Sequence, residues 1–355
     1  MSQSVPVTVV LPMSPHLLER IGAVSSLLDV TYLSRTQRYV YRDGRPLWAG
    51  YAEEPAPEED TGEARRALDE ILARTEVLLT NPMTPDDILD RAPALRWLQL
   101  TSAGVDRLLT TPVVQSGNVT VTTASGLHAV PISEYILGAI IAFAKGFPGA
   151  IQKQHDHLWQ PHLPRELEGA TAGILGLGAI GKRAAELCKG LGMRVLAIRR
   201  SAERRMTGAE AGEPAIDELL PRSELHTLLA ESDYVVLAVP LTEESRGMIG
   251  EAELRAIKPG AVIVNIARGA VIDQPALISA LRAGHLGGAA LDVTDPEPLP
   301  ADHELWDVPN VMITPHISGG TPRYMDRAID IFVENLEKYL AGEPLRNVVD
   351  PKRGY

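Results

Sequence analysis

The chain has 355 residues with 46 Asp or Glu against 34 Lys or Arg, which gives a formal net charge of −12. This length corresponds to about two domains of roughly 150 residues. The acidic balance argues against a nucleic-acid binder, which presents a basic surface to phosphates, and against docking on an anionic membrane. Hydrophobic residues make up 45% of the chain, which is enough for substantial cores.

The cysteine content and the N-terminal residues indicate which kinds of site and which cellular location to expect. The single cysteine, Cys188, excludes an intrachain disulfide and any multi-cysteine metal or iron–sulfur site, and we expect it in a core. The start lacks the basic and apolar regions of a secretory signal, and no run of about 20 apolar residues is present. We therefore expect a cytoplasmic protein. His155 and His157 would point to different faces of a helix, so we expect no metal site.

The first part of the chain alternates short apolar runs with helical patterns, which is typical of a parallel α/β sheet. Thr84, followed by Pro and two acids, predicts a helix with Thr84 as its N-cap. The acidic, proline-containing stretch 53–60 predicts a solvated loop. The predicted strands are 5–11, 77–80 and 96–100, and the predicted helices start at 15, span 64–73 and start at 84.

A second and more regular series follows a predicted helix over 131–154. Its strand and helix patterns again alternate, which indicates a second parallel α/β sheet. The last helix, 324–340, is amphipathic, and we expect the tail of the chain to return to the first domain. The predicted strands are 172–175, 194–198, 234–239, 261–266, 288–293 and 311–314, and the predicted helices are 180–191, 225–229, 251–256 and 274–283.

A glycine-rich motif lies between a predicted strand and a predicted helix of the second series. In this context the first glycine permits a tight turn, the second lets the backbone approach a pyrophosphate, and the third lets the helix pack closely on the strand. The helix N-terminus offers N–H groups to the phosphates. The motif predicts a dinucleotide site, with an ordinary glycine-rich turn as the alternative, and comprises Gly176, Gly178, Ala179, Ile180 and Gly181.

The end of the next strand bears on the choice of coenzyme. An NAD site places Asp or Glu there to bind the ribose 2′-hydroxyl. Here the residues are Arg199, Arg200 and Ser201, and no acid lies between Gly190 and Ala202. Because guanidinium groups form charge-assisted bonds to phosphate, they predict NADP(H), with NAD(H) as the less preferred coenzyme. The alternative is two surface arginines at a strand end.

Three later segments end at the carboxyl edge of the predicted sheet, where open α/β sheets bind ligands. They carry Arg268 in Asn-x-Ala-Arg-Gly, Glu297 in a proline-rich turn, and His316 in Thr-Pro-His. A cation can anchor a 2-oxoacid, a histidine can give a proton to the developing alkoxide, and a carboxylate can orient that histidine. Each residue alone could be structural. Together with the glycine motif they predict hydride transfer.

From about residue 77 to 347, and most strongly over 173–319, the chain resembles the D-isomer-specific 2-hydroxyacid dehydrogenases. The resemblance rests on the glycine motif, the segment 233–249 and the three segments above. It implies an NADP-preferring 2-oxoacid reductase of the glyoxylate/hydroxypyruvate type. It also implies a homodimer that forms through the cofactor domain, with the apolar helix 131–147 at the contact between the subunits. The implied fold is two Rossmann-like, doubly wound parallel-sheet domains: a substrate-binding domain in two segments, 1–124 and 318–355, with the NAD(P)-binding domain, 125–317, inserted between them.

The resemblance also implies roles for individual residues. Arg268 would bind the 2-oxoacid, and His316, paired with Glu297, would be the acid in reduction and the base in oxidation. The turn Ser102-Ala103-Gly104 would hold the substrate carboxylate with backbone N–H groups, as an anion nest does; the alternative is an ordinary strand-to-helix turn. Further coenzyme contacts are implied for Val239, Pro240, Ser245, Ile266, Ala267 and Asp292, the last at the nicotinamide carboxamide.

Two other functions remain open at this point. A dinucleotide-sensing, corepressor-like binding protein could retain all of these residues. A formate- or phosphite-oxidising dehydrogenase could use the same fold. An assay that follows NADPH absorbance with a panel of 2-oxoacids, formate and phosphite separates the three.

Overall fold

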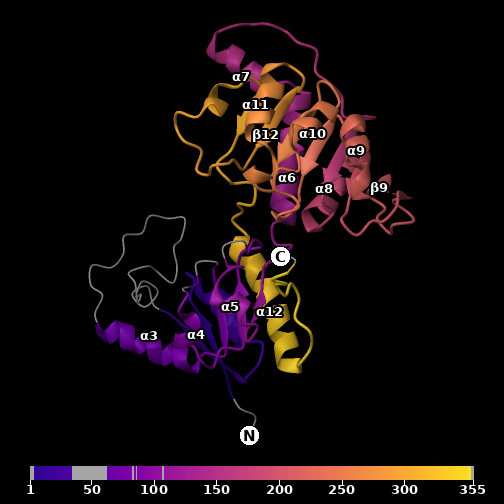
Figure 1. The fold of residues 1–355 in the computed structure, drawn as a ribbon. Coiled ribbons are helices and arrows are strands. Elements are labelled where there is room, and N and C mark those ends of the chain that lie inside the picture. The colour runs from indigo at the N-terminus through magenta and orange to yellow at the C-terminus, as the bar shows by residue number, and fades with distance from the viewer. Residues whose placement is uncertain (1–3, 34–61, 82–83, 85, 106–107, 353–355) are drawn as a thin grey trace. The chain divides into compact units, whose positions relative to one another are not determined.

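The computed structural model describes residues 4–33, 62–81, 84, 86–105 and 108–352. The chain divides into two compact units (Figure 1): a first unit, Met1–Leu127 with Thr321–Tyr355, and a second unit, His128–Gly320. The domain boundaries predicted from the sequence lie after residues 124 and 317. The acidic stretch 53–60 lies outside the described residues.

The first unit is built on a sheet of five strands in the order β2-β1-β3-β4-β5, all paired in parallel. Its last helix comes from the end of the chain: Ile329, Phe332 and Leu336 are buried against strand residues, and Phe332 contacts the ring of Trp97 at 5.2 Å between centroids. The elements are β1 (Val5–Val9), α1 (Pro15–Gly22), β2 (Leu28–Tyr32), α3 (Gly62–Arg74), β3 (Val77–Thr80), α4 (Ile88–Arg91), β4 (Trp97–Leu100), α5 (Pro112–Gln115), β5 (Thr120–Thr122) and α12 (Tyr324–Ala341).

The second unit contains an eight-stranded sheet in the order β13-β12-β11-β10-β6-β7-β9-β8, parallel except for the β8–β9 pair. Its strands are β6 (Thr171–Leu175), β7 (Arg194–Ile198), β8 (Met206–Thr207), β9 (Glu218–Leu220), β10 (Tyr234–Leu237), β11 (Val262–Asn265), β12 (Gly288–Leu291) and β13 (Val311–Ile313). Its helices are α6 (Ala129–Ala144), α7 (Phe147–His155), α8 (Ala179–Gly190), α9 (Leu225–Glu231), α10 (Glu251–Ala256) and α11 (Gln274–Arg282), with short 3-10 turns at Arg222–Glu224, Gly269–Val271 and Glu304–Asp307.

The strand order of the second unit defines where a ligand would bind. The chain proceeds from β6 outward to β7, and then returns to the other side of β6 with β10. In open α/β sheets the crevice at such a reversal, at the carboxyl ends of the strands, is the usual ligand site. The expected fold class, two Rossmann-like parallel sheets, is confirmed.

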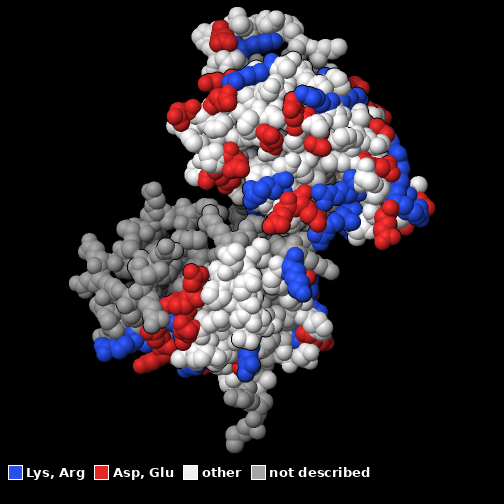
Figure 2. Space-filling view, viewed as in Figure 1, with Lys and Arg blue, Asp and Glu red and all other residues white. Residues whose placement is uncertain are grey.

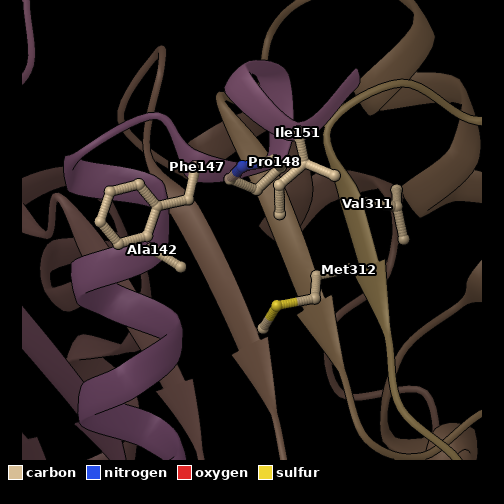
Figure 3. A pocket seen from close by; sticks show the side chains of 6 residues that line it. All are labelled: Ala142, Phe147, Pro148, Ile151, Val311 and Met312. Carbon is tan, nitrogen blue, oxygen red and sulfur yellow. The ribbon is translucent and has the colours of Figure 1, made fainter. Parts of the chain in front are cut away.

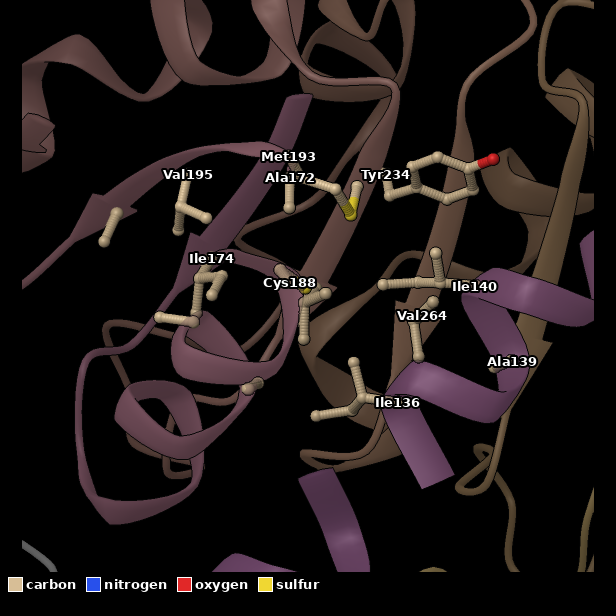
Figure 4. Close-up of a cluster of buried hydrophobic side chains, with 14 of the residues drawn as sticks. Ile136, Ala139, Ile140, Ala172, Ile174, Cys188, Met193, Val195, Tyr234 and Val264 are labelled. Atoms are coloured by element: carbon tan, nitrogen blue, oxygen red, sulfur yellow. The ribbon is translucent and has the colours of Figure 1, made fainter. Parts of the chain in front are cut away.

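The core of the second unit joins helices to one face of this sheet (Figure 4). Ile136 and Ile140 of α6 lie in the same cluster as Cys188 of α8 and Ile174 of β6. Burial raises the pKa of the Cys188 thiol to about 12, so this thiol stays protonated at neutral pH. The expected core position of Cys188 is confirmed.

Two helix predictions were wrong. The predicted helix over 131–154 is two helices, because Gly146 adopts a left-handed conformation (φ 69°) that ends α6, and α7 starts anew with Pro148 in its first turn. The helix predicted from Thr84 starts only at Ile88. The Thr84 hydroxyl donates to the Asn81 carbonyl at 3.2 Å and caps no helix. The short strands β2, β5, β8 and β9 were not predicted.

No single helix in the described ranges is long and apolar enough to cross a membrane. Together, α6 and α7 meet that criterion by length and composition alone, and a bend of 64° separates them.

Candidate active site

The glycine motif forms a tight loop between β6 and α8. A Cβ added to Gly176 (φ 100°) would lie 2.4 Å from the Ala238 carbonyl oxygen, and one added to Gly181 would lie 2.0 Å from the Gly176 carbonyl oxygen. Neither position therefore accepts a side chain without a shift of the backbone. At Gly178 an added Cβ would meet nothing in the described structure within 4 Å. The loop is thus tightly packed at Gly176 and Gly181 and open at Gly178. Helix α8 starts next to this open position, so the N–H groups of its first residues, Ala179 and Ile180, lie there. This shape fits a pyrophosphate.

The loop after β10 borders the glycine loop. Val239 approaches within 3.1 Å of the Cβ position of Gly176. The buried Ser245 hydroxyl donates to the Pro240 carbonyl at 2.7 Å and accepts from the Thr242 backbone N–H at 2.8 Å. Ser245 therefore fixes the conformation of the loop that carries Val239 and Pro240.

The basic residues predicted to select the coenzyme follow β7. Arg200 and Ser201 lie exposed in the turn at the strand end. The Arg199 guanidinium is paired instead with Glu213, Nη1 to Oε1 at 3.1 Å, and the same oxygen lies 2.6 Å from Lys182 Nζ. Glu213 was not identified from the sequence, since it lies 14 residues beyond Arg199 and belongs to no motif.

His316 and Glu297, which are 19 residues apart in the chain, form a direct hydrogen bond. The distance from His316 Nδ1 to Glu297 Oε1 is 2.6 Å. A carboxylate at Nδ1 favours the tautomer that carries its proton there, which leaves Nε2 for other partners. The backbone of His316 has φ 54°, which non-glycine residues rarely adopt. Such strained positions cluster at functional sites.

Asp292, which follows β12, holds the turn that contains His316. Its carboxylate is buried and accepts three hydrogen bonds: from the Thr314 hydroxyl at 2.6 Å, and from the backbone N–H groups of Ile317 and Ser318 at 2.9 Å each. In addition, the Asp292 carbonyl accepts from the His316 backbone N–H at 2.9 Å. This arrangement explains how the unusual backbone of His316 is maintained.

A tyrosine of α6 extends this network. The Tyr135 and Thr314 hydroxyls lie 2.8 Å apart. Because the single Thr314 proton is donated to Asp292, Tyr135 donates to Thr314. Burial is the main cause that raises the pKa of Tyr135 to about 12. Tyr135 therefore remains a hydrogen-bond donor at neutral pH.

Arg268 lies in the loop after β11, which is shaped by Asn265. The Asn265 side chain donates to the Arg268 carbonyl at 3.0 Å and accepts from the Ala267 N–H at 3.0 Å, and Arg268 Nη1 donates to the Ala267 carbonyl at 2.7 Å. A Cβ added to the next residue, Gly269, would lie 2.0 Å from the carbonyl carbon of Thr294. The loops after β11 and β12 therefore touch, and Ile266 and Ala267 are buried beside them.

The predicted substrate turn belongs to the first unit. The Ser102 hydroxyl donates to the Gly104 carbonyl at 2.9 Å, and the Ser102 carbonyl accepts from the Ala124 N–H at 2.8 Å. Ser102, Ala103 and Gly104 thus form a hydrogen-bonded turn at the carboxyl end of β4. Across the described residues, no group of three or more His, Cys, Asp or Glu side chains is arranged to hold a metal ion.

Comparison with known proteins identifies the family of this chain. Residues 137–318 match the model of the "D-isomer specific 2-hydroxyacid dehydrogenase, NAD binding domain". The chain is 34% identical to a glyoxylate reductase of Korarchaeum cryptofilum over 282 residues, which are 77% of this chain and 81% of that protein. It is 31% identical to a D-3-phosphoglycerate dehydrogenase of Archaeoglobus fulgidus over 294 residues, 82% of this chain, but spans 54% of that longer protein.

A solved structure has the same fold over the full chain. It is a D-isomer specific 2-hydroxyacid dehydrogenase from Xanthobacter autotrophicus Py2 in complex with NADPH and MES, 28% identical, with a TM-score of 0.77 and 100% of each chain covered. The chain therefore belongs to the D-isomer specific 2-hydroxyacid dehydrogenases, which are oxidoreductases that use a nicotinamide coenzyme.

The hydrogen bonds of Asp292 lead to a prediction about stability. In Asp292→Asn one of the three donors would face an amide N–H₂ group inside a buried site. We expect the free energy of unfolding of the second unit to fall by about 2–3 kcal/mol. Urea denaturation followed by circular dichroism measures this change, with the exposed Asp295→Asn in the same loop as the control. Equal stability of the two variants would contradict the structural role given to Asp292.

Proposed function

We propose that this protein reduces a small 2-oxoacid to the D-2-hydroxyacid with NADPH, and catalyses the reverse reaction with NADP. The observation that carries the proposal is the His316–Glu297 hydrogen bond, held by Asp292 at the same sheet edge as Arg268. The second unit would bind the coenzyme, and the first unit would bind the substrate through the turn Ser102–Gly104.

Each catalytic residue would act through one group. The Arg268 guanidinium would bind the substrate carboxylate and carbonyl, because it presents several N–H donors in one plane. His316 Nε2 would donate a proton to the oxygen of the carbonyl as negative charge develops there, and would accept it in the reverse reaction. Glu297 would hold Nδ1 and stabilise the imidazolium form through their hydrogen bond.

The coenzyme would be held by residues of the second unit alone. Gly176, Gly178 and Gly181, with the first N–H groups of α8, would bind the pyrophosphate, and the free acceptor capacity of Asp292 would suit the nicotinamide carboxamide. When bound, the coenzyme supplies the hydride in reduction. The remaining coenzyme contacts that we propose are Ala179, Ile180, Arg199, Arg200, Ser201, Val239, Pro240, Ser245, Ile266 and Ala267.

The role of His316 is tested by substitution. His316→Ala removes the proton donor, so kcat for 2-oxoacid reduction should fall about 100- to 10,000-fold. Glyoxylate, hydroxypyruvate, formate and phosphite are compared, with coenzyme binding titrated separately. As a control, His303→Gln changes a histidine outside the proposed proton path, and should keep most of the activity. Full turnover in His316→Ala would refute the assignment.

The same panel decides between the alternative functions. Turnover with formate or phosphite but with no 2-oxoacid would favour the formate- or phosphite-type reaction. Coenzyme binding without turnover of any compound would favour a dinucleotide-sensing binding protein.

The preference for NADP(H) is supported by Arg199, Arg200 and Ser201 and by the NADPH in the Xanthobacter relative. One charge-assisted hydrogen bond contributes about 1.5–3 kcal/mol, which corresponds to a preference of roughly 10- to 100-fold. We expect kcat/KM to be higher with NADPH than with NADH by a factor in this range. A clear preference for NADH would contradict the proposal.

We also propose a homodimer. Its contact is not the predicted helix 131–147, in which Ile132, Ile136 and Ile140 are buried, but α7 and the segment after it, which Figure 1 shows as a long arc between α7 and β6. Large apolar side chains are exposed here among polar ones: Trp159 is 98% and Leu163 95% exposed. Exposed aromatic and aliphatic side chains of this kind mark interaction sites. Residues of α7 also line a hollow of about 370 Å³ (Figure 3), whose lining is Ala142, Phe147, Pro148, Ile151, Val311 and Met312.

The dimer proposal is tested by sedimentation equilibrium. The double variant Trp159→Ser, Leu163→Ser should dissociate at concentrations at which the unchanged chain is a dimer, since it removes two exposed apolar side chains. Leu191→Ser, 39% exposed on another part of the second unit, is the matched control. A monomeric unchanged chain would refute the proposal.

The cytoplasmic location and the lack of nucleic-acid or membrane partners stay predictions from the sequence.

A further inference from the structure

One carboxylate in the second unit contacts Arg199, a residue of the proposed coenzyme site, and Lys182 in the first turn of α8, the helix that follows the glycine loop. Glu213 Oε1 lies 3.1 Å from Arg199 Nη1 and 2.6 Å from Lys182 Nζ. The Glu213 side chain is 15% exposed, against 32% for Arg199 and 47% for Lys182. The carboxylate is thus the most buried member of the group. Salt screens a partly buried pair of this kind less than it screens exposed side chains, such as the Lys, Arg, Asp and Glu that Figure 2 shows over one face of this unit.

The backbone holds Glu213 in this place. The Glu213 N–H donates to the Gly208 carbonyl at 2.8 Å, and the Ile216 N–H donates to the Glu213 carbonyl at 3.1 Å. A Cβ added to Gly208 would lie 1.9 Å from the Ile216 carbonyl oxygen, so the two ends of this loop are in direct contact. The loop leads from β8 to β9, and β9 pairs with β7. The fold therefore returns Glu213 to the end of the strand that carries Arg199.

The position of Glu213 bears on coenzyme choice. In an NAD site, an acid near the end of the second strand accepts a hydrogen bond from the ribose 2′-hydroxyl, and its negative charge repels a 2′-phosphate. In this chain no acid follows β7 directly, but Glu213 reaches Arg199 from 14 residues away. In addition, the buried Arg199 Nε has no hydrogen-bond partner among the described residues. Arg199 is therefore incompletely satisfied by Glu213 alone.

We propose that Glu213 is a specificity-determining residue, whose carboxylate weakens the preference of the site for a 2′-phosphate over a 2′-hydroxyl. It neutralises part of the positive charge of Arg199 and Lys182, and it offers an acceptor to a hydroxyl. The proposal rests on the coenzyme site of the proposed function. It predicts that the preference for NADP(H) is set by a balance between Glu213 and the basic residues, and is smaller than the arginines alone would give.

The test uses two nucleotides that differ only in the 2′-phosphate, 2′,5′-ADP and 5′-AMP, titrated calorimetrically into the full-length chain. Glu213→Gln keeps the shape of the side chain and its acceptor oxygen but removes the charge. We expect 2′,5′-ADP to bind about five- to tenfold more tightly to this variant than to the unchanged chain, and 5′-AMP to bind within about twofold. Lys182→Gln should move the preference in the opposite direction.

Glu210→Gln is the matched control, because Glu210 lies in the same loop and pairs with Arg204 and Thr207. The ratio of the two dissociation constants should be unchanged in this variant. An unchanged ratio in Glu213→Gln, or an equal change in both variants, would overturn the inference. The titration requires no turnover. Failure of both nucleotides to bind the unchanged chain would therefore refute the proposed coenzyme site itself, and the inference with it.

Discussion

The position of His316 depends on the buried carboxylate of Asp292. A residue with positive φ other than glycine is stable only when its surroundings determine its conformation. Here the carboxylate binds Thr314 on one side of the turn and two backbone N–H groups on the other. Burying a carboxylate is costly unless hydrogen bonds compensate for the lost water. The three donors offset that cost, and because all three belong to the turn after β13, the turn has one stable geometry.

The parallel sheet explains why these groups meet at all. Strands β11, β12 and β13 are neighbours and run in the same direction, so the residues after them lie along one edge. Arg268, Glu297 and His316 follow these three strands in turn. Close contact at Gly269, where a side chain would collide with the backbone of Thr294, brings the first two loops together. Close packing of one backbone on another thus brings these loops together.

The strands and helices of the second unit were largely predictable, because strands buried on both faces are continuous apolar runs that end at turn residues. The predicted 194–198 strand and 251–256 helix match β7 and α10 in full. Short edge elements were missed: β8 has two residues, and the burial of β2 does not follow a simple pattern. The break at Gly146 had a sequence signal, a glycine followed closely by Pro148, which the apolar composition of the surrounding helix outweighed.

The contact between Arg199 and Glu213 shows a different limit. A sequence motif compares residues at fixed spacing, and at that spacing the chain has two arginines and a serine but no acid. Electrostatic energy depends on distance in space, and the pairing of β9 with β7 places a carboxylate 3.1 Å from Arg199. Glu213 shares no motif spacing with Arg199, so the charge at this strand end could not be obtained from the sequence. The net charge of the whole chain likewise does not predict whether the site binds a small anion. The charge that such an anion meets is determined by the few groups within a Debye length of about 8–10 Å.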